Sequence, residues 1–248
     1  MKNLSGGNVA LALACQSWLR DDFEHEKTPP TNPMKFGNAV HRCIEADIKG
    51  ERVDIRAFID AEQLRGPSWP GKVERRYDAW CKWAAKRNRE GWLAEKAIAY
   101  HVHKDTARWL PDGRGWQKYK DVDRASEIPL VIDLLVPPLD GVVEVWDWKT
   151  GRVNFEKDKP QARACGLGAA RLYGVDRARV NLLYIAEDDE PFHWGEEVDE
   201  FYAIGLASSL EWVFQLEEVE PKPGAHCESL YCAAKAHCLK YRIDHGGE

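Results

Sequence analysis

The sequence predicts a mixed α/β fold in which a small sheet is flanked by helices. Several segments repeat apolar residues every third or fourth position, which is typical of amphipathic helices. Shorter apolar runs, bounded by turn sequences, indicate strands. The chain has 248 residues, of which 44% are hydrophobic and 31% are charged, so it can bury the core of one elaborated domain.

The N-terminal part is predicted to be helical. A first helix is expected within Ser5–Phe23, and the three prolines of Lys27–Pro33 indicate a loop. Gly37–Ile48 is expected to form a second helix, because Val40, Ile44 and Ile48 recur one turn apart.

A third helical stripe is basic on its remaining faces. Its apolar positions are Val73, Tyr77, Trp80 and Ala84. The segment also carries seven basic residues: Lys72, Arg75, Arg76, Lys82, Lys86, Arg87 and Arg89. Two interpretations stay open at this point, a solvated helix face and a face that contacts phosphates.

Three strands are expected in the middle of the chain. The first begins near Leu93, and the others are Pro129–Val136 and Val142–Trp148. The segment 137–141, Pro-Pro-Leu-Asp-Gly, has the composition of a tight turn. The second and third strands are therefore predicted to form an antiparallel hairpin.

The remaining segments alternate between helix and strand. Lys159–Tyr173 is expected to be a helix, Val180–Ile185 a strand, and Glu197–Leu216 a long helix. The apolar positions of that last helix include Phe201, Ile204, Leu210 and Phe214. We expect a single domain over 1–248, with an N-terminal helix and loop (1–36), a core (37–220) and a cysteine-rich tail (221–248).

Composition excludes several classes of protein. The net charge of −6 argues against a protein that coats nucleic acid through a global positive field, although a local basic face can still contact phosphates. No apolar run is long enough to span a bilayer, and Val9–Cys15 is short for a signal peptide. We therefore expect a cytoplasmic protein without a membrane partner. No glycine-rich loop ends in Lys-Ser or Lys-Thr, so a nucleotide-hydrolysing motor has no support.

Three charged residues stand in the apolar strands of the predicted hairpin. Asp133 lies in one strand, and Asp147 and Lys149 lie two residues apart in the other, so that the latter two point to the same side. A carboxylate among apolar residues must be paired or bind a cation. A buried Asp–Lys ion pair satisfies this requirement, and so does a metal site.

Hydrolysis of a phosphodiester suits this set of residues. The reaction needs an activated water and stabilisation of the charge that builds on the phosphoryl oxygens, and a hard divalent cation on oxygen ligands supplies both. Asp133 and Asp147 can hold such a cation. Lys149 can orient or help to deprotonate the water, or stabilise the phosphate.

The order of these residues resembles the RecB-like branch of the PD-(D/E)XK nuclease superfamily, which includes CRISPR-adaptation nucleases, AddAB-type nucleases and phage exonucleases. The matching elements, in chain order, are Leu4-Ser5 and Cys15, Gly37 followed by His41, Glu95, Ile132-Asp133, Asp147-Trp148-Lys149-Thr150-Gly151, and Gln161. Two positions depart from the pattern: Leu130 replaces a glycine, and Cys165 replaces a tyrosine four residues after the glutamine.

The resemblance implies a restriction-endonuclease-like core and a defined active site. His41, Asp133, Asp147 and the backbone carbonyl of Trp148 are then expected to bind Mg²⁺ or Mn²⁺. Lys149 is expected to be catalytic, together with the two aspartates, and Gln161 to support the site or contact DNA. Glu45, one turn after His41, is either a support for that histidine or a solvated residue.

The C-terminal tail crowds three of the seven cysteines: Cys227, Cys232 and Cys238. Four thiolates can hold an iron–sulfur cluster or a zinc ion. The resemblance implies a structural [4Fe–4S] cluster on these three residues and Cys15, which would join the two ends of the chain. The gap between Cys227 and Cys232 is longer than the usual one, and zinc, with His226 or His237 as possible ligands, is the alternative.

The leading hypothesis is a DNA exonuclease that acts on single strands or duplex ends. The alternative is a non-catalytic nucleic-acid-binding protein that keeps the fold and a cysteine-bound metal. A site-specific endonuclease is a third reading, which lacks a visible recognition domain. Nothing in the sequence identifies a protein partner.

Overall fold

A computed structural model of the chain describes residues 4–15, 29–112, 119–185, 190–215 and 238. Six strands form one sheet in the order β2-β1-β3-β4-β5-β6. The strands are β1 (Leu93–His101), β2 (Thr106–Trp109), β3 (Glu127–Leu139), β4 (Val142–Lys149), β5 (Arg177–Tyr184) and β6 (Phe192–Val198). Only β4 and β5 run parallel, and the other neighbours are antiparallel. The mixed α/β prediction is confirmed.

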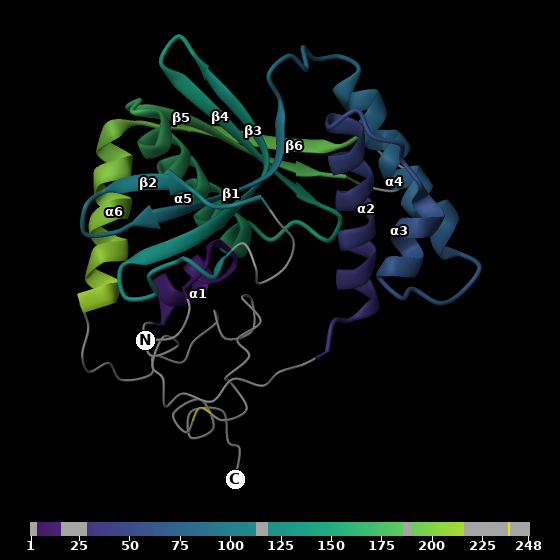
Figure 1. The fold of residues 1–248 in the computed structure, drawn as a ribbon, viewed down its shortest axis with the longest axis horizontal. Helices are drawn as coiled ribbons and strands as arrows, with labels where there is room; N and C mark the ends of the chain where they lie inside the picture. The colour runs from purple at the N-terminus through teal and green to yellow at the C-terminus, as the bar shows by residue number, and fades with distance from the viewer. Residues whose placement is uncertain (1–3, 16–28, 113–118, 186–189, 216–237, 239–248) are drawn as a thin grey trace.

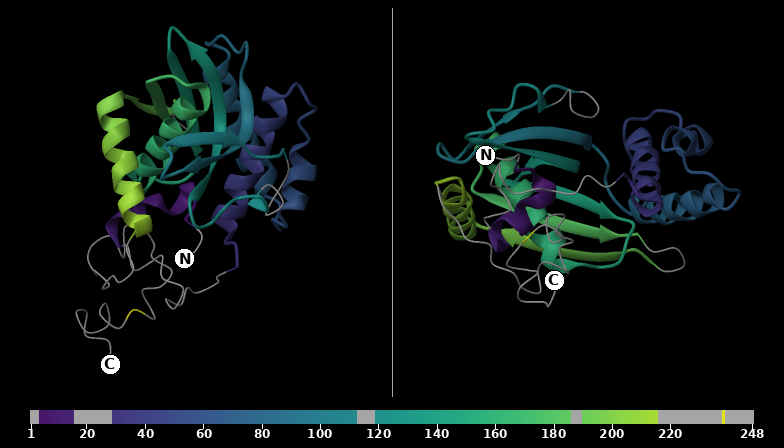
Figure 2. Two further views of the ribbon diagram at one scale, coloured as in Figure 1. Left: turned by 60° about the vertical axis from the view of Figure 1, so that its left-hand side comes forward. Right: turned by 90° about the horizontal axis from the view of Figure 1, so that it is seen from below.

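The helices cover both faces of this sheet. They are α1 (Val9–Ala14), α2 (Asn32–Ile48), α3 (Ile55–Ala61), α4 (Trp69–Ala84), α5 (Phe155–Tyr173) and α6 (Glu200–Gln215), preceded by the 3₁₀ turn η1 (Gly6–Asn8). Figures 1 and 2 show α2, α3 and α4 together at one side of the sheet, with α1, α5 and α6 at the other. None of the described helices is long and apolar enough to cross a membrane.

Each face of the sheet has its own core. Trp146 and Trp148 of β4 pack with Trp80 and Trp83 of α4 in the core beneath α2–α4. Val145, which precedes Trp146, packs in the core beneath α5. The alternation of side chains along β4 therefore directs Asp147 and Lys149, which share the side of Val145, toward α5.

The predicted hairpin is confirmed, but its turn is tighter than expected. β3 continues through Pro137 and Pro138, where the register with β4 shifts between Val136 and Leu139. A register irregularity is where a strand tolerates proline. The turn itself is Asp140-Gly141, with φ of 52° and 75°, so both central residues are left-handed as a type I′ turn requires.

Three elements escaped the sequence prediction: α3, β2 and β6. Residues assigned to the start of the last helix instead complete β6, and α6 begins at Glu200. Helix α2 begins at Asn32 instead of Gly37, because Thr31 caps it and Pro33 is tolerated in the first turn. Helix α5 likewise begins at Phe155, capped by the Asn154 side chain.

The first helix and the last helix differ in detail from expectation. Helix α1 ends at Ala14, and Cys15 is extended; the rest of the expected Ser5–Phe23 helix lies outside the described residues. On α6, Phe201 and Ile204 are exposed, while Leu210 is buried. The core face of α6 consists of Ala203, Leu206, Ala207, Leu210 and Val213.

Candidate active site

The hairpin β3–β4 brings the three central charged residues together. The backbone N–H of Trp148 donates to Asp133 Oδ2 at 2.8 Å, which ties the carboxylate of β3 to the neighbouring strand. Lys149 Nζ lies 2.7 Å from Asp147 Oδ2. The side chains of Asp133, Asp147 and Lys149 are 12%, 13% and 19% exposed, so all three charges are largely removed from water.

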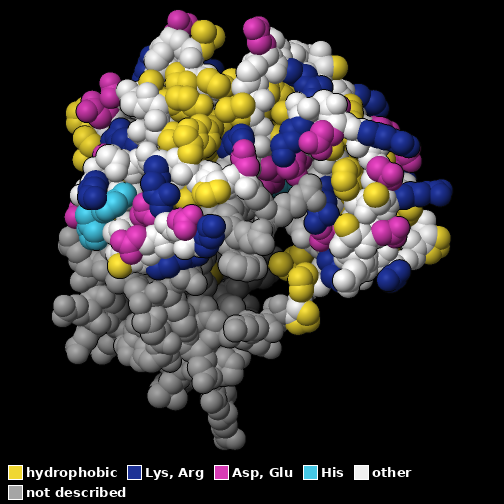
Figure 3. All heavy atoms as spheres, viewed as in Figure 1, with side chains coloured by type: hydrophobic (Ala, Val, Ile, Leu, Met, Phe, Trp, Pro, Cys, Tyr) yellow, Lys and Arg dark blue, Asp and Glu magenta, His cyan; other side chains and the backbone are white. Residues whose placement is uncertain are grey.

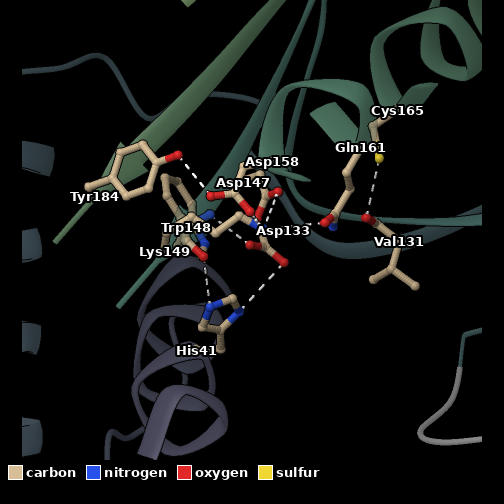
Figure 4. Close-up of polar contacts among 10 residues, drawn as sticks. All are labelled: His41, Val131, Asp133, Asp147, Trp148, Lys149, Asp158, Gln161, Cys165 and Tyr184. Atoms are coloured by element: carbon tan, nitrogen blue, oxygen red, sulfur yellow. Dashed lines mark hydrogen bonds and ion pairs between the residues drawn. The ribbon is translucent and has the colours of Figure 1, made fainter. Parts of the chain in front are cut away.

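Helix α2 supplies a histidine to this cluster. His41 Nε2 lies 3.0 Å from the carbonyl oxygen of Trp148, and Nδ1 lies 3.5 Å from Asp133 Oδ1 (Figure 4). Helix α2 approaches the hairpin so closely that a Cβ added to Gly37 would lie 3.1 Å from Thr150 Oγ1. The glycine, the histidine and the threonine of the sequence pattern therefore meet where α2 contacts the end of β4.

A third acidic residue reaches the cluster from β1. Glu95 faces Asp133 across the strands, between the registered pairs Ala94–Leu134 and Lys96–Ile132. Its φ is 50°, a left-handed conformation that is uncommon for a glutamate within a strand. On the facing strand, Ile132 packs in the core beneath α5 and Leu134 in the core beneath α2. Residues two apart normally share one face of a sheet, so the alternation of side chains along β3 is interrupted at Asp133.

The three residues His41, Glu95 and Asp133 form a group that can hold a metal ion. One ligand atom from each lies within 4.8 Å of the others. Glu95 matches the family pattern, but the resemblance does not place it among the expected metal ligands. The position of Glu95 on a strand that pairs with the strand of Asp133 could have indicated that it is a ligand.

Helix α5 closes the other side of the cluster. Gln161 Oε1 lies 3.4 Å from Lys149 Nζ, so the expected glutamine does reach the site. Asp158 Oδ1 lies 3.7 Å from the same nitrogen. The hydroxyl of Tyr184, from β5, donates to Asp158 Oδ2 at 2.8 Å (Figure 4). Neither Asp158 nor Tyr184 belongs to the sequence pattern.

The pKa values of the site show how strongly its charges interact. Burial lowers the pKa of His41, but Asp133, Glu95 and Asp147 raise it by more, to about 9. Burial raises the pKa of Asp147, and repulsion from Asp133 adds to that effect, giving about 7. Burial also opposes ionisation of Asp133, but His41 and Lys149 outweigh it and hold its pKa below the ordinary value.

Lys149 is held in its charged form. Burial lowers its pKa, but Asp147 first and Asp158 second raise it by more, so the net shift is upward. The site thus gathers four carboxylates, those of Asp133, Asp147, Glu95 and Asp158, around His41 and Lys149. His41 lies between Asp133 and the Trp148 carbonyl. Carboxylate and carbonyl oxygens are the ligands that suit Mg²⁺ and Mn²⁺, and His41 adds a ring nitrogen. The residues therefore fit a divalent cation.

Other candidate residues are placed differently. Cys15 and Cys238 are both buried, whereas Cys227 and Cys232 lie outside the described residues. Glu45 forms an ion pair with Lys49 at 2.5 Å rather than supporting His41. Cys165 is buried and its Sγ lies 3.5 Å from the Val131 carbonyl oxygen.

The basic segment of α4 and the residues after it is compatible with both a solvated helix face and a face that contacts phosphates. Arg87 stacks on Trp83 at 3.7 Å, and Arg89 forms an ion pair with Asp47. A hollow of about 970 Å³ near its end is lined by Arg75, Asp78, Ala79, Lys82, Trp83, Ala85, Lys86, Arg87, Glu190, Pro191 and His193. In Figure 3 acidic and basic side chains gather where the sheet meets α2.

Comparisons with known proteins identify the family. The family model of the PD-(D/E)XK nuclease superfamily matches residues 14–239. The crystal structure of SSO0001 aligns with 87% of this chain and 89% of its own, with a TM-score of 0.38 and 15% sequence identity. No curated protein matches the sequence. Because the family match spans nearly the whole sequence, the chain belongs to the PD-(D/E)XK nuclease superfamily, a family of metal-dependent nucleases.

Proposed function

We propose that this protein is a Mg²⁺- or Mn²⁺-dependent DNA exonuclease that acts on single strands or duplex ends. One observation carries the proposal: ligand atoms of His41, Glu95 and Asp133 lie within 4.8 Å of one another, beside the charged pair Asp147–Lys149. A non-catalytic binding protein has no need of this set, because burying so many charges is unfavourable unless they serve a cation or a reaction.

The metal ligands are proposed to be His41, Asp133, Asp147 and the Trp148 carbonyl, with Glu95 as a further carboxylate. When bound, the cation lowers the pKa of a water molecule and neutralises charge on the phosphoryl oxygens. The chain contributes the orientation of the ligands. The Trp148 N–H fixes Asp133, and the close packing of α2 against Thr150 fixes His41.

Lys149 and Gln161 complete the proposed site. Because Lys149 is held protonated, its ammonium can donate to the attacking water and stabilise the negative charge that grows on the phosphate. Gln161 limits the positions that the ammonium can take, because its amide oxygen lies 3.4 Å from Nζ.

Cleavage of end-labelled DNA tests the proposal. Linear single-stranded, linear duplex and circular single-stranded DNA are incubated with anaerobically purified protein and Mn²⁺, Mg²⁺ or EDTA. We expect metal-dependent release of short products from linear DNA and none from circles. Cleavage of circles would replace the exonuclease by an endonuclease, and binding without any cleavage would favour the non-catalytic alternative.

We further propose that Cys15, Cys227, Cys232 and Cys238 hold a structural [4Fe–4S] cluster that joins segments 1–36 and 221–248 to the core. The burial of Cys15 and Cys238 agrees with such a role. Iron and zinc contents of anaerobically purified protein test it. We expect a brown protein with about four irons per chain, and loss of colour and of thermal stability in Cys232→Ser. Zinc without iron would identify the alternative site.

A further inference from the structure

Asp158 is one of four buried polar or charged residues among those the structure describes, and no part of the family resemblance accounts for it. It is 5% exposed and lies in the first turn of α5. Its backbone N–H donates to the Asn154 carbonyl at 2.9 Å. A carboxylate is favoured at this end of a helix, because the helix dipole and the unpaired N–H groups are positive there.

The two oxygens of Asp158 have different neighbours. Oδ2 accepts the hydroxyl of Tyr184 at 2.8 Å, and Oδ1 faces Lys149 Nζ at 3.7 Å. Tyr184 is the register partner of Lys149 in the parallel pair β4–β5. Tyr184, on β5, therefore holds the Asp158 carboxylate from the strand beside the one that carries Lys149.

Lys149 needs this second carboxylate for a physical reason. Its ammonium lies 2.7 Å from Asp147 Oδ2, which is the closer anion. The charge of Asp147 is shared with the metal ion once that residue acts as a ligand, as the proposed function requires. The largely buried Lys149 ammonium then has less negative charge beside it to balance its own. A nearby carboxylate that does not bind the metal ion must balance the rest.

We propose that Asp158, fixed by the Tyr184 hydroxyl, is a positioning residue that holds the Lys149 ammonium in place while Asp147 binds the metal ion. The inference rests on the proposed nuclease function. It assigns the two carboxylates around Lys149 to two tasks, one to the metal ion and one to the lysine.

Kinetics of the variants Asp158→Asn and Tyr184→Phe test this role. Asp158→Asn keeps the size of the side chain and an oxygen for Tyr184 while it removes the charge. We expect kcat for DNA cleavage to fall by roughly 10- to 100-fold, as for other small misplacements of a catalytic group. KM and the affinity for Mn²⁺ should stay near the wild-type values, and Tyr184→Phe should lower kcat less.

Glu156→Gln provides the matched control. Glu156 lies in the same first turn of α5 but is exposed, so its substitution removes the same charge at the same helix end without touching Lys149. It should cleave like the wild type. A kcat of Asp158→Asn equal to that of this control would overturn the proposal. Weakened Mn²⁺ binding by Asp158→Asn would overturn it as well, because Asp158 would then serve the metal ion.

A double-mutant cycle gives a readout that does not depend on cleavage. Tm is measured in saturating Mn²⁺ for the wild type, Asp158→Asn, Lys149→Met and the double variant. Non-additive shifts are expected, because the two side chains interact directly. Additive shifts would contradict the contact. If the wild type does not cleave DNA, the nuclease proposal fails, while the cycle still decides whether Asp158 holds Lys149.

Discussion

At the scale of single residues, the site places four carboxylates beside two cationic side chains, and a bound divalent cation would reduce the repulsion among the carboxylates. Burial raises the pKa of Asp147, and repulsion from the Asp133 carboxylate adds to that effect, giving about 7. The pKa of His41 is also raised: burial lowers it, but the negative charges of Asp133, Glu95 and Asp147 raise it by more, to about 9. These shifts are the features expected of a metal site whose ligands are protonated before the metal binds.

Metal affinity should therefore rise with pH. A ligand must be deprotonated, and the raised pKa values mean that Mn²⁺ displaces a proton from His41 below about pH 9 and one from Asp147 below about pH 7. Calorimetric titrations between pH 6 and 9, in buffers of different ionisation enthalpy, measure both the affinity and the protons released. An affinity that does not change over this range would contradict the assignment of His41.

The same shift of His41 affects stability in the metal-free protein. Its pKa is 6.5 when unfolded and about 9 when folded, so the proton stabilises the fold below pH 6.5. That contribution is lost as the pH rises through about 9. His41→Gln should remove this part of the pH dependence of Tm, while the dependence due to other groups should remain.

Glu95 stores backbone strain at the site. Its φ of 50° is a conformation that costs about 1–3 kcal/mol for most residues and less for asparagine. Glu95→Asn should therefore keep or raise the Tm of the metal-free protein while weakening the binding of Mn²⁺. A lower Tm together with unchanged Mn²⁺ binding would show that Glu95 has a structural role only.

At the scale of elements, the sequence predicted the parts that carry strong local signals. The β3–β4 hairpin was predicted because Asp140-Gly141 separates two apolar runs, and the α4 stripe because Val73, Trp80 and Ala84 repeat with helical spacing. β6 was missed, since this edge strand is mostly exposed and carries Gly195 and two glutamates. α3 has only 7 residues and offers too few turns for a periodic pattern.

The packing of α5 on the sheet depends on two glycines that no local signal explains. A Cβ on Gly166 would lie 2.3 Å from Val180 Cγ1, and one on Gly168 would lie 2.7 Å from Leu130 Cδ1. Gly166→Ala should destabilise the protein by about 1–3 kcal/mol, because α5 must shift. Since α5 carries Gln161 and Asp158, cleavage should fall as well.

Gly205→Ala is the matched control for this packing. Gly205 lies in helix α6, and a Cβ there would meet nothing within 4 Å. Alanine should stabilise the helix by roughly 0.5–1 kcal/mol. The two variants are compared by urea unfolding, and a Gly166→Ala protein as stable as Gly205→Ala would show that α5 is not closely packed.

At the scale of the whole molecule, the site combines residues from β1, β3, β4, β5, α2 and α5. The sequence could predict His41, Asp133, Asp147, Lys149 and Gln161 because their order resembles a known family. It could not predict Asp158 or Tyr184, since their role arises only when α5 packs beside β5, so that the Tyr184 hydroxyl contacts Asp158 and Asp158 lies near Lys149. Contacts between residues far apart in the chain leave no trace in local patterns.

The most direct test of the central claim separates the metal ligands from the catalytic lysine. Mn²⁺ affinity and the cleavage rate of end-labelled linear DNA are measured for the wild type, Asp147→Asn and Lys149→Ala. We predict Mn²⁺-dependent cleavage by the wild type, loss of both cleavage and tight Mn²⁺ binding in Asp147→Asn, and loss of cleavage with Mn²⁺ binding retained in Lys149→Ala. Wild-type cleavage by Lys149→Ala, or unchanged Mn²⁺ binding by Asp147→Asn, would contradict the account.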